Sequence, residues 1–348
     1  MMPEVVTFGE VMIRLMPVDH LPFEEADMLY SLVGGSEYNM AVSCKRMGHS
    51  AMYVTVVPDN PYGARIIAQC DRFGIGGGIK KVKFDGLGKV RMGQYLVESG
   101  YGSRGDVVTY DRYGAAISQV KPGDFDWKKI FEGAKWFHFS GITPALGPKV
   151  AEVCIEACET ARSMGLKISV DLNYRGKLWT KEEARNTMSE IVKYVDIIIG
   201  NEEDCATCLG IVPAGVDENY KDLKTASYKT VADKVFETWS NVKMIATTLR
   251  EVKQANINMW RAILADRASG KLYESKKYEV HVIDRLGGGD SFSGAMVSGL
   301  LEGMDLQDAL ELAVAWSNLT HTYVGDICLA TRSMAEKIAA GGGARVQR

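Results

Sequence analysis

The sequence predicts an α/β protein with three layers (αβα), in which a mostly parallel central sheet lies between two layers of helices. Short apolar segments alternate with amphipathic helical segments along most of the chain, as in repeated β-strand, α-helix, β-strand units. Two stretches, residues 12–33 and 89–116, interrupt this alternation, because Tyr, Val and Thr alternate there with charged and Gly residues. We expect these stretches to form antiparallel strands outside the main sheet.

The expected elements follow from the spacing of apolar residues along the chain. Strands are expected at residues 5–9, 52–57, 136–140, 167–171, 196–200 and 244–248. Helices are expected at residues 39–47, 60–73, 149–164, 180–195, 225–239 and 306–320. We interpret residues 1–340 as one domain, and residues 341–348, which begin with three glycines, as a mobile tail.

Composition and charge exclude several classes of protein. The chain has 348 residues, of which 46% are hydrophobic, and a net charge of −3. Such a charge offers no basic surplus for the phosphates of nucleic acid. The start of the chain lacks a basic and apolar leader, and no apolar run approaches the roughly 20 residues that span a bilayer. We therefore expect a cytoplasmic protein that binds neither nucleic acid nor membrane.

The most informative segment spans residues 279–292. An apolar alternation at residues 280–283 is followed by Gly287, Gly288 and Gly289, then by Asp290 and an apolar helical spacing from Phe292. Glycine amides at a helix N-terminus can converge on an anion. A carboxylate beside such a site is expected if it takes a proton from an attacking hydroxyl group. This combination indicates a small-molecule kinase, while the alternative is that Asp290 only caps the helix.

This segment resembles a signature of the ribokinase-like (PfkB) carbohydrate kinases, usually Asp-Thr-x-Gly-Ala-Gly-Asp-x-Phe. Here Arg285 replaces Thr and Gly288 replaces Ala. Residues 34–41, Gly-Gly-Ser-Glu-Tyr-Asn-Met-Ala, resemble the N-terminal signature of the same family. Residues 110–112, 138–144, 171–175 and 248–250 resemble the subgroup that acts on 2-keto-3-deoxygluconate. The resemblance implies a ribokinase-like domain with a small β-sheet lid, which transfers the γ-phosphoryl group of ATP to the terminal hydroxyl of that keto acid.

The resemblance also implies roles for individual residues. Asp290 would be the base, and the amides of Gly287, Gly288 and Gly289 would form the anion hole. The substrate would contact Gly34, Gly35, Asn39, Tyr95, Tyr110, Arg112, Ile142 and Arg175. The nucleotide would contact Asn201, Thr248, Arg250, Gly287, Gly289 and Asn318, and Mg²⁺ would be organised through water by Asn201 and Asp204.

The arginines carry the expectation of a sugar acid. A guanidinium fork can bind a carboxylate in two places, so Arg112 and Arg175 would recognise the keto acid, although an arbitrary Arg more often forms a surface ion pair. The alternatives are a kinase for a neutral sugar such as fructose or ribose, and a sugar-acid sensor without turnover. Exposed lid strands often pair between subunits, so we expect a homo-oligomer.

Overall fold

The computed structural model describes residues 2–201, 203–212 and 225–342, and the structural statements below concern these residues. Most of the tail expected at 341–348 lies outside them.

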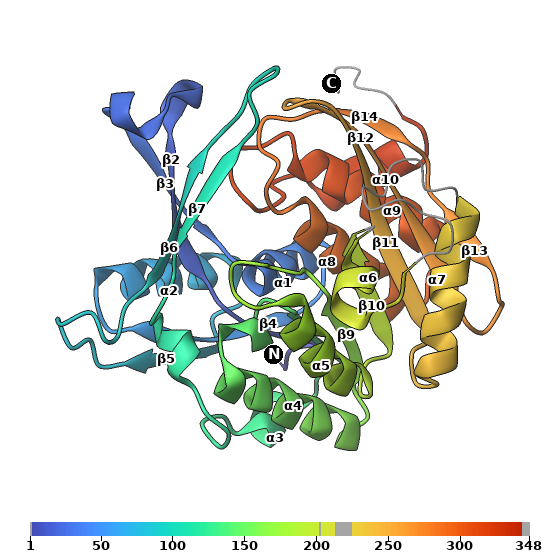
Figure 1. The fold of residues 1–348 in the computed structure, drawn as a ribbon, viewed down its shortest axis with the longest axis horizontal. Helices are drawn as coiled ribbons and strands as arrows, with labels where there is room; N and C mark the ends of the chain where they lie inside the picture. The colour runs from blue at the N-terminus through green and yellow to red at the C-terminus, as the bar shows by residue number, and fades with distance from the viewer. Residues whose placement is uncertain (1, 202, 213–224, 343–348) are drawn as a thin grey trace.

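One large sheet runs through the centre of the molecule (Figure 1). Its described strands follow the order β13-β12-β11-β10-β9-β8-β1-β4-β5, and β14 pairs with β12. Neighbours from β5 to β11 are parallel, while β12, β13 and β14 form an antiparallel edge. The strands are β1 (Val5–Phe8), β4 (Ala51–Pro58), β5 (Gly78–Val82), β8 (Trp136–Ser140), β9 (Lys167–Asp171), β10 (Ile197–Asn201), β11 (Met244–Gln254), β12 (Ile257–Asp266), β13 (Leu272–Glu274) and β14 (Tyr278–His281).

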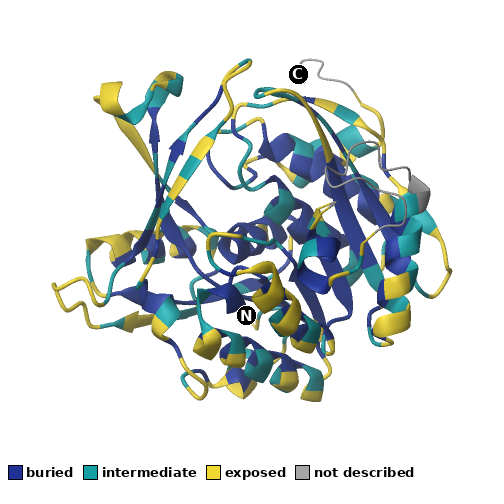
Figure 2. Ribbon diagram, viewed as in Figure 1, coloured by how far each residue is buried: buried dark blue, intermediate teal, exposed yellow. Residues whose placement is uncertain are grey.

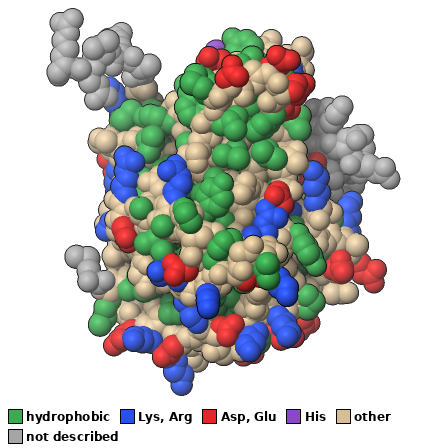
Figure 3. Space-filling model, turned by 90° about the vertical axis from the view of Figure 1, so that its left-hand side faces the viewer, with side chains coloured by type: hydrophobic (Ala, Val, Ile, Leu, Met, Phe, Trp, Pro, Cys, Tyr) green, Lys and Arg blue, Asp and Glu red, His purple; other side chains and the backbone are tan. Residues whose placement is uncertain are grey.

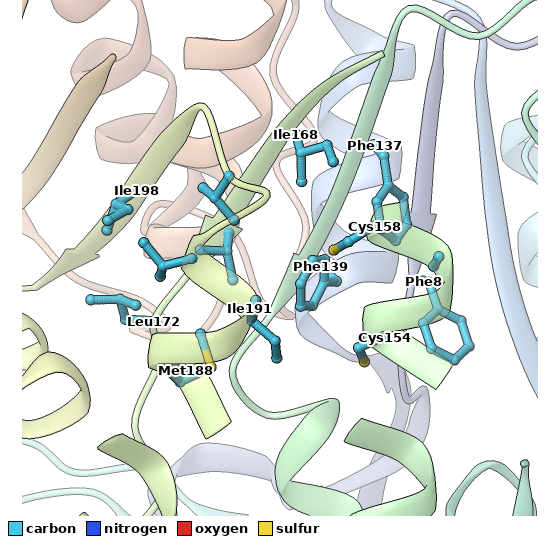
Figure 4. Packing of buried hydrophobic residues seen from close by; sticks show 14 of the residues in the cluster. Phe8, Phe137, Phe139, Cys154, Cys158, Ile168, Leu172, Met188, Ile191 and Ile198 are labelled. Atoms are coloured by element: carbon cyan, nitrogen blue, oxygen red, sulfur yellow. The ribbon is translucent and has the colours of Figure 1, made fainter. Parts of the chain in front are cut away.

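Helices cover both faces of this sheet, so its inner strands are buried while the outer sides of the helices are exposed (Figure 2). One face packs against α3 (Trp127–Ile130), α4 (Pro148–Ser163), α5 (Lys181–Val192), α6 (Asp204–Leu209) and α7 (Thr225–Thr238). The other face packs against α1 (Ser36–Arg46), α2 (Pro61–Phe73), α8 (Gly288–Leu301), α9 (Leu306–Thr320) and α10 (Arg332–Ala339). Figure 4 shows the first interface, where Phe137 and Phe139 of β8 lie against Cys154 and Cys158 of α4.

A second, smaller sheet stands apart from the large one (Figure 1). Its order is β3-β2-β6-β7, with β2 (Met12–Pro17), β3 (Leu29–Gly34), β6 (Gly93–Glu98) and β7 (Val107–Asp111). The two expected stretches do form this sheet, but the prediction that all its strands are antiparallel was wrong, since β2 and β6 pair in parallel. The reason is topological, because both strands continue outward from the main body, β2 after β1 and β6 after β5.

The strands and helices predicted from the apolar spacing are all present. The predictions at 136–140, 167–171 and 306–320 coincide with β8, β9 and α9. Helix α5 begins at a capping box, in which Thr180 and Glu183 bond each other's backbone amides. Strands β5, β12 and β13, helices α3, α6 and α10, and the short helices η1 (Val18–His20), η2 (Phe23–Glu25), η3 (Ala116–Gln119) and η4 (Pro144–Leu146) were not predicted. Within the described part of the chain, no helix combines the length and the apolar composition needed to cross a membrane.

Candidate active site

Asp290 lies in the first turn of α8, where α8 packs against the start of α1. Ser36 Oγ donates a hydrogen bond to Asp290 Oδ1, and Asn39 Nδ2 donates one to Oδ2, both over 2.7 Å. Burial raises the pKa of Asp290 above its ordinary value, while these two hydrogen bonds act against the rise. The result is a fixed carboxylate that is a stronger base than a carboxylate in water.

The glycines that precede Asp290 have different environments. Gly287 has a left-handed backbone with φ of 78°, and a Cβ there would collide with the carbonyl oxygen of Asp326. A Cβ at Gly288 would collide with the ring of His321, whereas a Cβ at Gly289 would lie 4.0 Å from its nearest neighbour, Asp171 Oδ2. The first two glycines are therefore required by packing, and the third faces open space. The first amides of α8 have no acceptor within the helix, so they can bind an anion.

A cavity of about 340 Å³ opens in front of this turn, and we call it the first cavity. It lies at the ends of β9 and β10 and beside Thr248 and Arg250 of β11. The carboxyl ends of parallel strands are the usual place for a ligand. The described residues that line it are Asp171, Asn173, Arg175, Ile199, Gly200, Asn201, Glu203, Asp204, Thr248, Arg250, Trp260, Arg285, Leu286, Gly287, Gly288, Gly289, Asp290 and His321. The structure thus brings Asp290, the glycine turn and most of the expected nucleotide residues together. Asn318 is not among these residues, so its expected role stays a prediction.

One wall of the first cavity is formed by neighbouring residues of β10 and β11. Asn201 of β10 is paired with Thr248 of β11, and both residues line the cavity. Asp204 accepts hydrogen bonds from the amide of Asn201, at 2.9 Å to Oδ2, and from the amide of Tyr174, at 3.2 Å to Oδ1. Burial raises the pKa of Asp204, although these amides act against the rise. Asp204 therefore holds two strand ends together, which the sequence did not indicate.

Asn201 and Asp204 are the residues expected to organise Mg²⁺. Among the described residues, no group of three or more His, Cys, Asp or Glu side chains could hold a metal ion. Asn201 Oδ1 already accepts a bond from the amide of Glu203. The oxygens of Asn201 and Asp204 can accept further hydrogen bonds from water, so they fit a magnesium ion held through water and not by direct ligation.

Arg175 follows a strained residue at the end of β9. Asn173 has a positive φ of 36°, which is uncommon outside glycine and turns the chain toward the cavity. Arg175 Nη1 donates to the carbonyl of Tyr174 at 3.3 Å, and its Nε is buried without a hydrogen-bond partner. Burial raises the pKa of Asp171, Asp204 and Asp290, and the positive charge of Arg175 acts against this rise. An anion in this cavity would meet both a free donor and a positive charge.

A second cavity, of about 1320 Å³, lies beside the small sheet and shares Arg175 with the first. It is lined by several cations, namely Lys89, Arg91, Arg112, Arg175 and Lys177, and by the carboxylate of Asp111. Asp111 is paired with Arg91. Arg112 lies over the ring of Tyr110, 5.1 Å from the ring centre. The surplus of positive charge suits an anionic ligand.

Arg112 has a partner that the sequence did not suggest. Its Nη2 forms a buried ion pair with Glu10, while its Nε has no hydrogen-bond partner. Burial raises the pKa of Glu10, and Arg112 acts against the rise. A ligand carboxylate at Arg112 would therefore share the guanidinium with Glu10.

Tyr95 belongs to a buried network below the glycine turn. Its hydroxyl donates to Asp326 Oδ2 at 2.7 Å, and its ring stacks on Tyr110 with 5.9 Å between centres. Arg14 of β2 pairs with both Asp326 and Asp284, each at 2.7 Å. Because Asp284 begins the segment that leads into the glycine turn, this network joins the small sheet to the site.

The remaining expected substrate residues make close contacts within the protein. A Cβ at Gly34 would collide with the hydroxyl of Tyr95, and a Cβ at Gly35 with the carbonyl of Glu10. Ile142 is buried in the turn after β8, where its amide donates to Ser140 Oγ at 3.3 Å. Contacts of these three residues with a substrate stay predictions.

Several residues of the site were missed in the sequence. Ser36 lies within the N-terminal signature but its partner Asp290 is 254 residues away, so no local pattern could connect them. Trp260 and His321 line the first cavity with ring centres 5.2 Å apart, and Trp260 Nε1 is buried without a hydrogen-bond partner. Burial lowers the pKa of His321 to about 4, so its ring is neutral. Trp260 was missed because strand β12 was not predicted.

Comparison with known proteins gives the family. Residues 2–233 and 262–332 match the model of the pfkB family of carbohydrate kinases. The chain is 32% identical over 348 residues to the 2-dehydro-3-deoxygalactonokinase of Haloferax volcanii, with 100% of both chains covered. It is 27% identical over 331 residues to the 2-dehydro-3-deoxygluconokinase of Thermoproteus tenax, covering 93% of this chain and 90% of the other. The crystal structure of the 2-dehydro-3-deoxygluconokinase of Thermotoga maritima is similar with a TM-score of 0.90 and 40% identity, over 97% of this chain and 99% of that one. The chain belongs to the pfkB family of carbohydrate kinases.

Proposed function

We propose that this kinase transfers the γ-phosphoryl group of ATP to the terminal hydroxyl of a 2-keto-3-deoxy sugar acid, derived from gluconate or galactonate. The observation that carries the proposal is the position of Asp290. It is held by Ser36 and Asn39 on one wall of the first cavity, beside the glycine turn. Arg175 lines both cavities, so a sugar in the second cavity could reach a phosphate in the first.

The class of sugar follows from charge. A neutral sugar gains little from the five cations that line the second cavity, whereas a carboxylate gains charge-assisted hydrogen bonds. Arg112 and Arg175 each have a buried Nε without a hydrogen-bond partner. Its N–H can donate a hydrogen bond to a carboxylate or phosphate. The names of the relatives in Haloferax and Thermotoga support the same class of substrate.

The chain's own residues suggest how transfer proceeds. Asp290 accepts the proton of the sugar hydroxyl as that oxygen attacks phosphorus, because its raised pKa makes it a better base. The amides of the glycine turn and the charge of Arg175 stabilise the negative charge on the transferring group. Bound ATP with Mg²⁺ would supply the phosphoryl group and neutralise part of its charge, with Asn201 and Asp204 holding the ion through water. The small sheet would act as a lid that excludes water from the sugar.

The test is a phosphorylation assay with a panel of acceptors. The panel contains 2-keto-3-deoxygluconate, 2-keto-3-deoxygalactonate, gluconate, fructose and ribose. Wild type should prefer a keto-deoxy acid, and Asp290→Asn should lower kcat by about 10²–10⁴-fold, the usual contribution of a general base. A protein that consumes ATP equally well with and without Asp290 would refute the proposed mechanism and favour a sensor without turnover.

A second variant tests the recognition of the carboxylate. Arg112→Ala alone would leave Glu10 buried without its partner, so it is combined with Glu10→Gln. The double variant should raise the KM for the keto acid about 10–100-fold, the value of one charge-assisted contact, and change the KM for ATP little. Arg72→Ala, which removes an exposed arginine of α2, is the control. Wild-type preference for fructose or ribose would instead support the neutral-sugar alternative.

We also propose that two copies associate through the small sheet. Its edge strands β3 and β7 carry exposed apolar side chains, with Leu29 43% and Val107 53% exposed. Figure 3 shows hydrophobic side chains on the face of the molecule that carries this sheet. Light scattering of wild type and Leu29→Lys tests this proposal. The substitution should convert the dimer to a monomer, whereas a variant that remains dimeric would show that the interface lies elsewhere.

A further inference from the structure

Arg285 is one of two residues that depart from the family signature, which has Thr at this position. It lies in the segment between β14 and α8, two residues before Gly287, and lines the first cavity beside Leu286. The transfer proposed above does not use it. Arginine in place of threonine adds a positive charge and a long side chain close to the glycine turn.

The guanidinium of Arg285 has donors that no protein group uses. Its Nε lies 3.0 Å from Asp106 Oδ2, an ion pair in which the N–H does not point along a hydrogen bond. Its Nη2 is buried and has no hydrogen-bond partner. Buried donors without acceptors are unfavourable, so such groups in a cavity favour the binding of an anionic ligand.

Asp106 holds Arg285 from the small sheet. It precedes β7, and its Oδ1 accepts a hydrogen bond from the amide of Gly100 at 2.8 Å. The same connection between β6 and β7 reaches the turn between β11 and β12, where Gly102 donates to Asn256 Oδ1 at 3.1 Å. In Figure 1 the end of this hairpin approaches the strands β12 and β14. Arg285 is therefore placed where the small sheet meets the nucleotide side of the site.

We propose that Arg285 binds phosphate oxygens of the nucleotide in the first cavity, and that Asp106 is the residue that positions it. The inference rests on the proposed function, since it requires that this cavity binds a nucleoside triphosphate. A planar guanidinium can donate two parallel hydrogen bonds to one phosphate, which Thr and Lys cannot do. The contact would also link phosphate binding to the position of the small sheet, because Asp106 lies in the connection between β6 and β7 of that sheet.

The test is calorimetric binding of ATP, ADP and adenosine, each with Mg²⁺ and without a sugar acid. The variants are Arg285→Thr, Arg285→Lys and Asp106→Asn. Lys253→Thr is the control, because it removes a positive charge from an exposed ion pair with Glu279 outside the cavity. Arg285→Thr should weaken ATP about tenfold or more and leave adenosine unchanged, the effect of losing one charge-assisted contact. Arg285→Lys should recover only part of the loss, and Asp106→Asn should weaken ATP more than adenosine.

The calorimetric results distinguish a role of Arg285 in phosphate binding from a structural role. Equal weakening of ATP and adenosine by Arg285→Thr would show a structural role and overturn the inference, as would unchanged ATP binding. If Arg285→Thr does not fold, Arg285→Lys and Asp106→Asn decide in the same way. Wild type that binds no nucleotide would refute the proposed function itself. Normal ATP binding by Arg285→Thr with loss of transfer in Asp290→Asn would refute only the role of Arg285.

Discussion

Replacing Arg14 by Met is expected to be one of the most destabilising single changes in this protein. The side chain of Arg14 is 0% exposed and forms ion pairs of 2.7 Å with Asp284 and Asp326. Met has similar length and no charge, so the substitution removes the charge while filling much of the space. Two buried carboxylates would then remain without a cation.

The expected loss is about 3–5 kcal/mol at neutral pH, the usual cost of removing one partner from a buried ion pair. A typical domain is stable by only about 5–15 kcal/mol, so this loss is a large fraction. The loss should depend on pH. Burial already raises the pKa of Asp284 while Arg14 acts against the rise, so removal of Arg14 raises this pKa further. A carboxyl group whose pKa is raised in the folded state destabilises the protein increasingly as pH rises from its unfolded pKa of about 4 to its folded pKa, so the loss is smaller at lower pH.

Urea unfolding of wild type and variant at about pH 8 and about pH 5.5 measures this, and the difference should be smaller at the lower pH. Arg332→Met is the matched control, because Arg332 also pairs with two carboxylates, Glu302 and Glu336, but its side chain is 32% exposed. Its loss should be about 1 kcal/mol, as for exposed ion pairs. Equal losses at Arg14 and Arg332, or a larger loss at Arg14 in acid, would refute this electrostatic reasoning.

Three further predictions concern the glycine turn and two buried side chains. Gly287→Ala should destabilise the protein by more than about 1–2 kcal/mol, because a left-handed backbone and a collision with Asp326 both oppose a Cβ. Gly289→Ala should remain as stable as wild type. Equal midpoints of the two variants in thermal unfolding would contradict the geometry. Burial raises the pKa of Glu37 to about 7, so the ionisation of Glu37 lowers the free energy of unfolding as pH rises from about 4.5 to 7. In urea titrations across this pH range, Glu37→Gln should remove this contribution. The same pH dependence in wild type and variant would disprove the prediction. Tyr95→Phe should cost about 1–3 kcal/mol in urea unfolding, since Asp326 loses a buried donor, and no measurable loss would show that Arg14 alone satisfies Asp326.

Much of the central sheet could be predicted because the inner parallel strands are buried on both faces and are therefore short apolar runs. The outer strands β5 and β13 were missed because they are short and partly exposed, so their composition does not distinguish them from loops. The end of β11, from Arg250 to Gln254, is also exposed and was missed for the same reason. Strand β12 is different, because most of its residues are buried and apolar, so its sequence did carry a signal that the prediction missed.

The candidate site was predictable where one segment carries the chemistry and not where distant segments meet. The glycine turn and Asp290 lie within four consecutive residues, so their pattern alone indicated an anion site with a base. Asn39 was expected to bind the sugar, but its amide holds Asp290, 251 residues away. Arg112 was expected to meet a carboxylate of the substrate, and it already meets Glu10, which is 102 residues away. Such pairings depend on the packing of helices and sheets and leave no local signal.

The hydrogen bonds from Ser36 and Asn39 to Asp290 join two helices that are synthesised at different times. Helix α1 leaves the ribosome about 250 residues before α8, an interval of roughly 10–50 s at about 5–20 residues per second. During that time the face of α1 that later packs against α8 has no partner, so chaperones can recognise it. A nascent chain that lacks α8 also lacks Asp290, the base in the proposed mechanism. Under that mechanism, phosphoryl transfer begins only when α1 and α8 have packed together.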